Sequence, residues 1–199
     1  MNFDSWFVNF VGAAGRTGQL VFKKLLESQA QHGPFEVRGV VRTEKSAKKL
    51  MKKCKCDLDQ IVVADITSGF EGAGLDSADA MVICTSAVPV IIKRSLFKSI
   101  FSKLLGKPVQ RPLFRWRGPD QYPEKVDYEG QLAQIDLSKK IGVKQVVLVS
   151  SMGGTDETNF LNTVGKDSNG EGNGDILLWK RKAEKYLTEV WLDLHLWLL

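Results

Sequence analysis

The chain has 199 residues, 43% of them hydrophobic and 26% charged, which is typical of one globular domain rather than of a disordered or fibrous protein. No apolar run approaches the ~18 residues that a membrane-spanning helix needs. Three cysteines and two histidines are too few to predict a metal site, and the odd cysteine count predicts free thiols in a reducing, cytoplasmic compartment. Because the first predicted strand begins near Trp6, we also expect no cleavable targeting segment.

The formal net charge of +5 is concentrated in one segment. Residues 91–117 hold eight lysines and arginines and no acid, so that the rest of the chain has 20 basic against 23 acidic residues. This distribution argues against a protein that binds nucleic acid along its whole surface.

The first predicted element is a strand, glycine turn and helix within the sequence FVNFVGAAGRTGQLVFKKLL, which begins at Phe7. A glycine triplet in this context is typical of a dinucleotide site. Gly12 would allow the tight turn, Gly15 would let the backbone approach a pyrophosphate, and Gly18 would let the helix pack on the strand. The free N–H groups at the helix start would face the phosphates.

Phe35–Val41 is predicted as the second strand, and Arg42 follows it where NAD-preferring folds place an acid. A guanidinium at this position suits the 2′-phosphate of NADP, and Arg16 in the glycine turn could assist it. The alternative is that both arginines are solvated surface charges.

The next predicted elements are a lysine-rich helix over 44–53 and strands over 61–66 and 80–85. Asp65 and Ile66 could border an adenine ring. The small residues Thr85–Ala87 follow a buried strand, at the strand end where ligands bind in open α/β sheets.

Further predicted elements are helices over 126–141 and 176–189, with a strand over 143–150 and a polar loop between them. The alternation of strands and helices predicts an α/β fold with a doubly wound parallel sheet in a single domain over residues 1–199. A basic amphipathic insertion at 90–120 interrupts it, and the tail at 190–199 can add a sixth strand.

Seven ordered blocks carry a family resemblance: VGAAGRTG, VVRTEKS, ADIT, ICTSAVP, QYPEKVDYEGQ, GVKQVVLVSSMGGT and ILLWKRKAEKYL. Together they resemble an atypical short-chain dehydrogenase/reductase of the NAD(P)-binding, NmrA-like group. The resemblance implies a Rossmann fold that binds NADP across the strand ends. The cofactor-binding residues that it implies are Gly12, Ala14, Gly15, Arg16, Thr17, Gly18, Arg42, Asp65, Ile66, Thr85, Ser86, Ala87, Ser150 and Lys182.

The same resemblance implies a catalytic Ser, a Tyr and a Lys four residues after the Tyr. Ser151 matches the serine and Lys182 the lysine, but Leu178 stands at the tyrosine position and cannot transfer a proton. Tyr122 and Tyr128 are candidate sources of a phenol from elsewhere in the chain. After Glu189 the sequence departs from the family, which would continue into elements that wall the substrate pocket.

The sequence therefore predicts an NADP-binding oxidoreductase with an incomplete catalytic triad and an unknown small-molecule substrate. The alternative is a non-catalytic NADP-binding redox sensor or regulatory protein.

Within the insertion, apolar residues from Leu96 to Leu105 form one helical stripe beside several lysines. This stripe could pack on the domain as part of a substrate lid, or it could dock, with Trp116, on an anionic membrane or a partner protein.

Overall fold

A computed structural model of the chain describes residues 6–33, 35–66, 74–108, 112–167 and 169–190, together with the backbone of 197–198. Its main sheet has six parallel strands in the order β3-β2-β1-β4-β7-β8. The bounds are β1 (Trp6–Val11), β2 (Phe35–Val41), β3 (Ile61–Val63), β4 (Ala80–Ile83), β7 (Gln145–Leu148) and β8 (Trp197–Leu198). The chain starts in the middle of the sheet and winds outward in both directions, which confirms the predicted doubly wound Rossmann fold.

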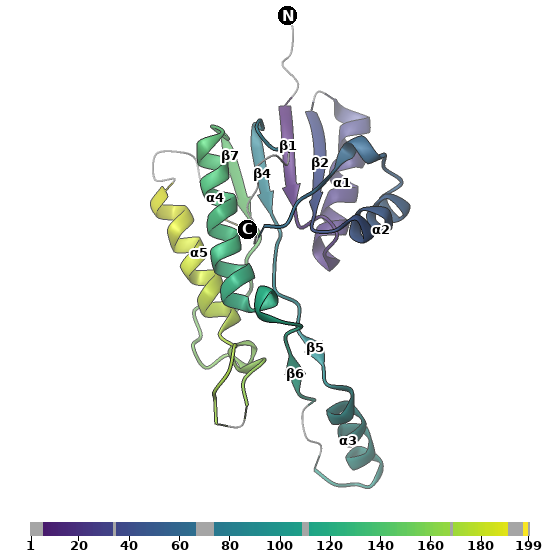
Figure 1. Cartoon of the computed structure of the whole chain (residues 1–199), viewed down its shortest axis with the longest axis vertical. Coiled ribbons are helices and arrows are strands. Elements are labelled where there is room, and N and C mark those ends of the chain that lie inside the picture. The colour runs from purple at the N-terminus through teal and green to yellow at the C-terminus, as the bar shows by residue number, and fades with distance from the viewer. Residues whose placement is uncertain are drawn as a thin grey trace, which may run out of the picture.

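Helices cover both faces of this sheet (Figure 1). The pair α1 (Arg16–His32) and α2 (Glu44–Cys54) lies on one face, and α4 (Gly130–Lys140) and α5 (Ile176–Val190) lie on the other. A π-helical segment, η3 (Glu124–Glu129), leads directly into α4. Single turns of 3₁₀ helix occur at η1 (Leu58–Gln60), η2 (Pro119–Gln121) and η4 (Phe160–Thr163).

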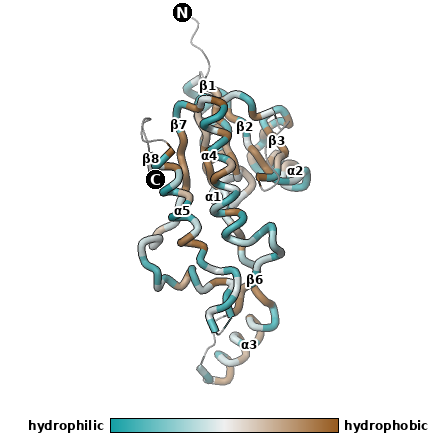
Figure 2. Tube along the Cα trace, turned by 60° about the vertical axis from the view of Figure 1, so that its left-hand side comes forward, coloured by the Kyte–Doolittle hydropathy of each residue, from teal (hydrophilic) through white to brown (hydrophobic). Residues whose placement is uncertain are grey.

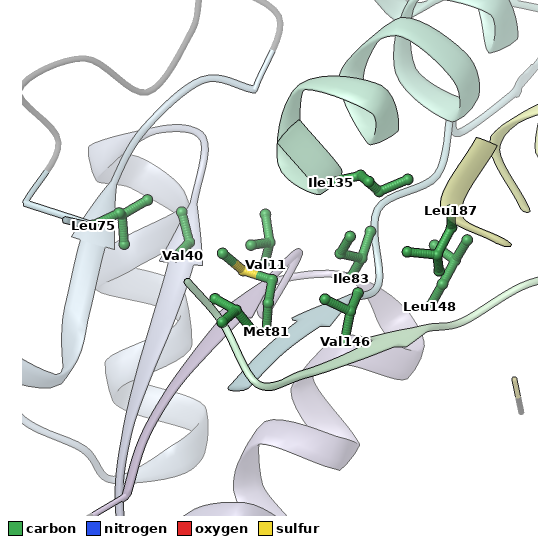
Figure 3. Packing of buried hydrophobic residues seen from close by; sticks show 10 residues of the cluster. Val11, Val40, Leu75, Met81, Ile83, Ile135, Val146, Leu148 and Leu187 are labelled. Atoms are coloured by element: carbon green, nitrogen blue, oxygen red, sulfur yellow. The ribbon is translucent and has the colours of Figure 1, made fainter. Parts of the chain in front are cut away.

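Alternation along the strands builds two cores, one on each side of the sheet. Phe10 of β1 packs with Phe22 and Leu50 in the cluster under α1 and α2. Its neighbour Val11 faces the other way, into a cluster with Ile135 of α4 and Leu187 of α5 (Figure 3). Because the strands carry buried side chains on both faces, they are the near-continuous apolar runs that the sequence shows.

Several predicted strands are shorter in the structure than in the sequence pattern. The strand expected over 61–66 ends at Val63, the one over 80–85 ends at Ile83, and the one over 143–150 ends at Leu148. In each case the chain leaves the sheet two or three residues early to form a loop at the carboxyl edge. The predicted sixth strand is present at 197–198, whereas 191–196, with His195, lie outside the described residues.

The basic insertion forms an arm that projects from the body of the domain (Figures 1 and 2). Strands β5 (Val90–Ile91) and β6 (Phe114–Arg115) pair antiparallel and carry α3 (Lys93–Leu104) at their far end. The predicted helix is therefore present, but it does not pack on the domain.

Among the described residues, no helix is long and apolar enough to cross a membrane, and no cluster of side chains could hold a metal ion.

Candidate functional site

A cavity of about 470 Å³ opens at the carboxyl ends of β1, β2, β4 and β7. The parallel register aligns these strand ends, because β1 pairs with β2 on one side and with β4 on the other. Every residue that the sequence predicts to bind the cofactor lines this cavity, except Lys182. Ser151, the predicted catalytic serine, lines it too.

The glycine turn forms one wall, and two of its glycines are required by the backbone itself. Gly12 has φ of +86°, and a Cβ there would lie 2.6 Å from the carbonyl oxygen of Cys84. A Cβ on Gly18 would lie 2.1 Å from the carbonyl oxygen of Gly12, so that α1 could not pack against the turn. Gly15 differs, because a Cβ there would lie no closer than 3.2 Å to any neighbour, and Gly15 lines the cavity.

The start of α1 fits the phosphates of a dinucleotide. Gly15 is the N-cap residue of α1, and no side chain accepts a hydrogen bond from the first N–H groups of the helix. The first turn also contains no acidic residue. The residues of this first turn, Arg16, Thr17 and Gly18, line the cavity. An uncapped helix start has N–H groups and a positive dipole end available to an anion. A nicotinamide dinucleotide is therefore compatible with this wall.

Arg42 and Arg16 both line the cavity and are both exposed. Arg42 follows β2 directly, and Ser46 of α2 lines the cavity close by in the sequence. Ser46 was not among the predicted site residues. Its hydroxyl lies 3.0 Å from that of Thr43, which caps α2 by accepting the Ser46 backbone N–H.

The Thr85–Ala87 loop is held rigidly by the helices behind it. The Thr85 carbonyl accepts a hydrogen bond of 3.0 Å from Gln131, and the Thr85 hydroxyl accepts one of 3.1 Å from Gln134. The Ala87 N–H donates to the Asp127 carboxylate at 2.9 Å. These three partners are all buried, so that the loop forms a fixed wall of the cavity.

Asp127 also binds a lysine that the sequence reasoning missed. Its side chain is fully buried, and its Oδ1 lies 2.7 Å from the Nζ of Lys180, whose side chain is 5% exposed. Lys180 lines the cavity. The π-helical segment that carries Asp127 is a local departure from α-helical geometry of the kind often found at functional sites.

Lys182, in contrast, points away from the cavity. Its Nζ lies 4.1 Å from the centre of the Trp179 ring and 5.9 Å from that of Tyr128, and the residue is exposed. Positions 180 and 182 lie about 200° apart on an α-helix, so that only one of the two lysines can face the sheet. The sequence holds a signal for the right one: Lys180 is spaced three residues from both Leu177 and Ala183 on the buried stripe of α5.

Neither the residue at the tyrosine position nor either candidate tyrosine lies in the cavity wall. Leu178 is 46% exposed and does not line the cavity. Tyr128 packs against Trp179 with ring centroids 5.7 Å apart, and Tyr122 lines a separate small pocket. Among the described residues, the cavity wall therefore contains no tyrosine.

Two further groups bear on the chemistry of the cavity. The Ser150 hydroxyl donates to the carboxylate of Glu184, which also pairs with Arg181 on the same helix. Burial raises the pKa of the Cys84 thiol above its usual value, and the positive charge of Lys180 only partly opposes this. Cys84 is thus a protonated thiol in the wall rather than a nucleophile.

The family described as NAD(P)H-binding matches residues 12–196 of the chain. Sanguinarine reductase from Eschscholzia californica is 43% identical over 187 residues, which cover 89% of this chain and 63% of that protein. An uncharacterised chloroplastic protein of Arabidopsis thaliana is 43% identical over 179 residues, which cover 89% of this chain and 47% of that protein. The chain thus spans less than two thirds of the length of these relatives.

Two solved structures illustrate the likeness in fold. One, described as an NAD-dependent epimerase/dehydratase from Bacillus halodurans, gives a TM-score of 0.60 at 22% identity and covers 92% of this chain and 64% of its own. The other is UDP-glucuronic acid 4-epimerase from Bacillus cereus in complex with NAD. It gives a TM-score of 0.57 at 16% identity, and the match covers 96% of this chain and 54% of that protein chain. At such identities, the likeness concerns the fold alone.

Proposed function

Because the chain belongs to the NAD(P)H-binding family, we propose that it is the cofactor-binding part of an oxidoreductase that prefers NADPH to NADH. The observation that carries the proposal is the single cavity that joins the glycine turn, Arg42, the Thr85–Ala87 loop and Lys180. A nicotinamide cofactor bound there would supply the hydride.

The preference for NADPH rests on Arg42, which lines the cavity at the end of β2. A charge-assisted contact to the 2′-phosphate contributes on the order of 1.5–3 kcal/mol. We therefore expect Arg42→Ala to weaken NADPH binding by about 10- to 150-fold and to leave NADH binding nearly unchanged. Fluorescence titration of both cofactors with the wild type and the variant tests this, and equal affinities in the wild type would refute the preference.

Lys180 is the proposed lysine of the reaction, in place of Lys182. Its ammonium group is buried in the cavity wall, held by Asp127, and available to contact the nicotinamide ribose or to donate a proton to a substrate oxygen. The Ser151 hydroxyl, also in the wall, would orient that oxygen. Asp127 acts as a positioning residue, since it fixes both Lys180 and the Ala87 backbone.

A non-catalytic NADP-binding sensor is the second candidate, and the lack of a tyrosine in the described cavity wall favours it. Steady-state NADPH consumption separates the two. The assay uses quinones, aldehydes and ketones, and includes sanguinarine because one relative is named as its reductase. Turnover that is lost in Lys180→Met but kept in Lys182→Met supports the enzyme, whereas NADPH binding without turnover supports the sensor.

The compartment stays a prediction. Cys54, Cys56 and Cys84 are all free thiols, which supports a reducing environment such as the cytoplasm, while one relative is described as chloroplastic.

A further inference from the structure

The apolar face of α3 is turned toward solvent. Phe97, Phe101 and Leu104 are 70%, 62% and 79% exposed, whereas Ser99, on the opposite side of the helix, is only 6% exposed. A helix that packs on a domain normally shows the reverse pattern, with polar residues outside. Exposed apolar patches of this kind mark interaction sites.

Polar contacts rather than apolar packing fix the orientation of α3. The backbone N–H of Leu113 donates to the Ser95 hydroxyl at 2.9 Å, and the Ile92 N–H donates to the Leu113 carbonyl at 2.9 Å. The Ser99 hydroxyl donates to the Ser95 carbonyl, also at 2.9 Å. The helix is therefore held at the end of the arm without burying Phe97, Phe101 or Leu104.

Every charged residue of the arm is basic. Lys93, Arg94, Lys98 and Lys103 lie on the helix and are exposed, and residues 91–117 contain no acid at all. None of these four cations pairs with a carboxylate among the residues that the structure describes. A surface that binds this helix must therefore offer an apolar region to its exposed apolar side chains and negative charges to its lysines and Arg94.

We propose that the α3 arm docks on an anionic lipid surface, with the apolar face in the boundary between headgroups and acyl chains. Phe97, Phe101 and Leu104 would enter that boundary, while the lysines and Arg94 contact the headgroups. A second copy of the chain fits less well, because it would bring two acid-free basic segments together. The arm projects beyond the rest of the molecule, so that the body does not obstruct its approach to a plane (Figure 1).

Trp116 is not part of this surface, although the sequence suggested that it could be. It is 7% exposed and packs with Ala87, Val126 and Val164 at the base of the arm. Its indole N–H donates to the Asn173 carbonyl. The tryptophan therefore anchors the arm to the domain rather than contacting a membrane.

Sedimentation of the full chain with vesicles tests the proposal. One set of vesicles is phosphatidylcholine with phosphatidylserine, and the other is phosphatidylcholine alone. The apolar variant is Phe97→Ser/Phe101→Ser, with Leu20→Ser/Leu58→Ser as its control, because these leucines are 66% and 62% exposed on other elements.

A second variant, Lys98→Glu/Lys103→Glu, reverses the charge of the arm. Its control is Lys48→Glu/Lys52→Glu, which changes the net charge equally on α2, where both lysines are exposed. Circular dichroism and NADPH titration show in parallel that each variant is folded.

We expect binding to the anionic vesicles at low salt, and weaker binding to the neutral ones. Each arm variant should bind about tenfold more weakly or worse, while its control binds like the wild type. Raising the salt from about 50 mM to about 500 mM should also weaken binding, since it shortens the Debye length about threefold. Absence of binding to anionic vesicles, or arm variants that bind like their controls, would overturn the proposal. If the wild type binds no vesicles but light scattering shows that it forms dimers, and Phe97→Ser/Phe101→Ser is monomeric, the membrane proposal is wrong and the apolar face of α3 is a self-association surface.

Discussion

The Lys180–Asp127 ion pair gives the sharpest test of how the cavity is built. Lys180→Met keeps a long unbranched side chain but leaves the fully buried Asp127 carboxylate without its counter-charge. Breaking a buried pair in this way costs about 3–5 kcal/mol, a large part of the ~5–15 kcal/mol that stabilises a typical domain. The double variant Asp127→Asn/Lys180→Met removes both charges, while the Asn oxygen still accepts the Ala87 N–H. We expect the double variant to recover most of the free energy of unfolding that Lys180→Met loses.

The Lys166–Asp175 pair is a matched control, because its Nζ–Oδ2 distance is also 2.7 Å while its side chains are 21% and 36% exposed. Lys166→Met should cost about 1 kcal/mol or less. Urea denaturation of the four proteins gives the free energies of unfolding. If Lys180→Met lowers the free energy of unfolding no more than Lys166→Met does, the buried ion pair does not stabilise the protein in the way described.

Two further predictions concern stability. Asn9 of β1 is fully buried, and neither its amide nitrogen nor its amide oxygen has a hydrogen-bond partner among the residues that the structure describes. Asn9→Leu should therefore raise the free energy of unfolding by about 1–3 kcal/mol, and an unchanged or lower value would show that the amide is bonded in solution. Asp79 has its pKa lowered by a hydrogen bond from Lys144 at 2.7 Å and another from the Phe7 backbone, so its stabilising effect is present above pH ~4 and disappears as the pH falls through the lowered pKa. Asp79→Asn should therefore destabilise the protein by about 0.5–1 kcal/mol at neutral pH and by progressively less as the pH falls below about 4, in urea titrations over this range. A deficit independent of pH would contradict this.

The sequence predicts the fold well because its signals are local. The glycine turn at Gly12 and the apolar strands each carry their own pattern, and the alternation of strands with helices predicts a parallel sheet. All the predicted cofactor residues except Lys182 come together, because the turn and the strand ends lie at one edge of a parallel sheet.

The rest of the site depends on contacts between distant segments. Lys180 is missed because its partner, Asp127, lies 53 residues earlier, and because counting from the tyrosine position of a linear motif selects the lysine on the wrong side of α5. The helical stripe of α3 reveals an apolar face but not what covers it, since a core, a partner and solvent all fit the same spacing. The burial of Trp116 likewise depends on contacts with residues about 50 positions later, such as Val164.

The central claim, that the glycine turn binds the dinucleotide phosphates, is tested most directly by NADPH titration of Gly15→Ala. This Cβ would lie in the wall of the cavity, 3.2 Å from the carbonyl oxygen of Gly12, so that the turn must shift by a few tenths of an ångström to accept it. Gly118→Ala adds the same group in open space, where no atom lies within 4 Å. We expect Gly15→Ala to unfold like the wild type but to bind NADPH about tenfold more weakly or worse, a loss of at least about 1.4 kcal/mol, while Gly118→Ala binds normally. Equal NADPH affinity in the wild type, Gly15→Ala and Gly118→Ala, or no NADPH binding by the wild type, would contradict the claim.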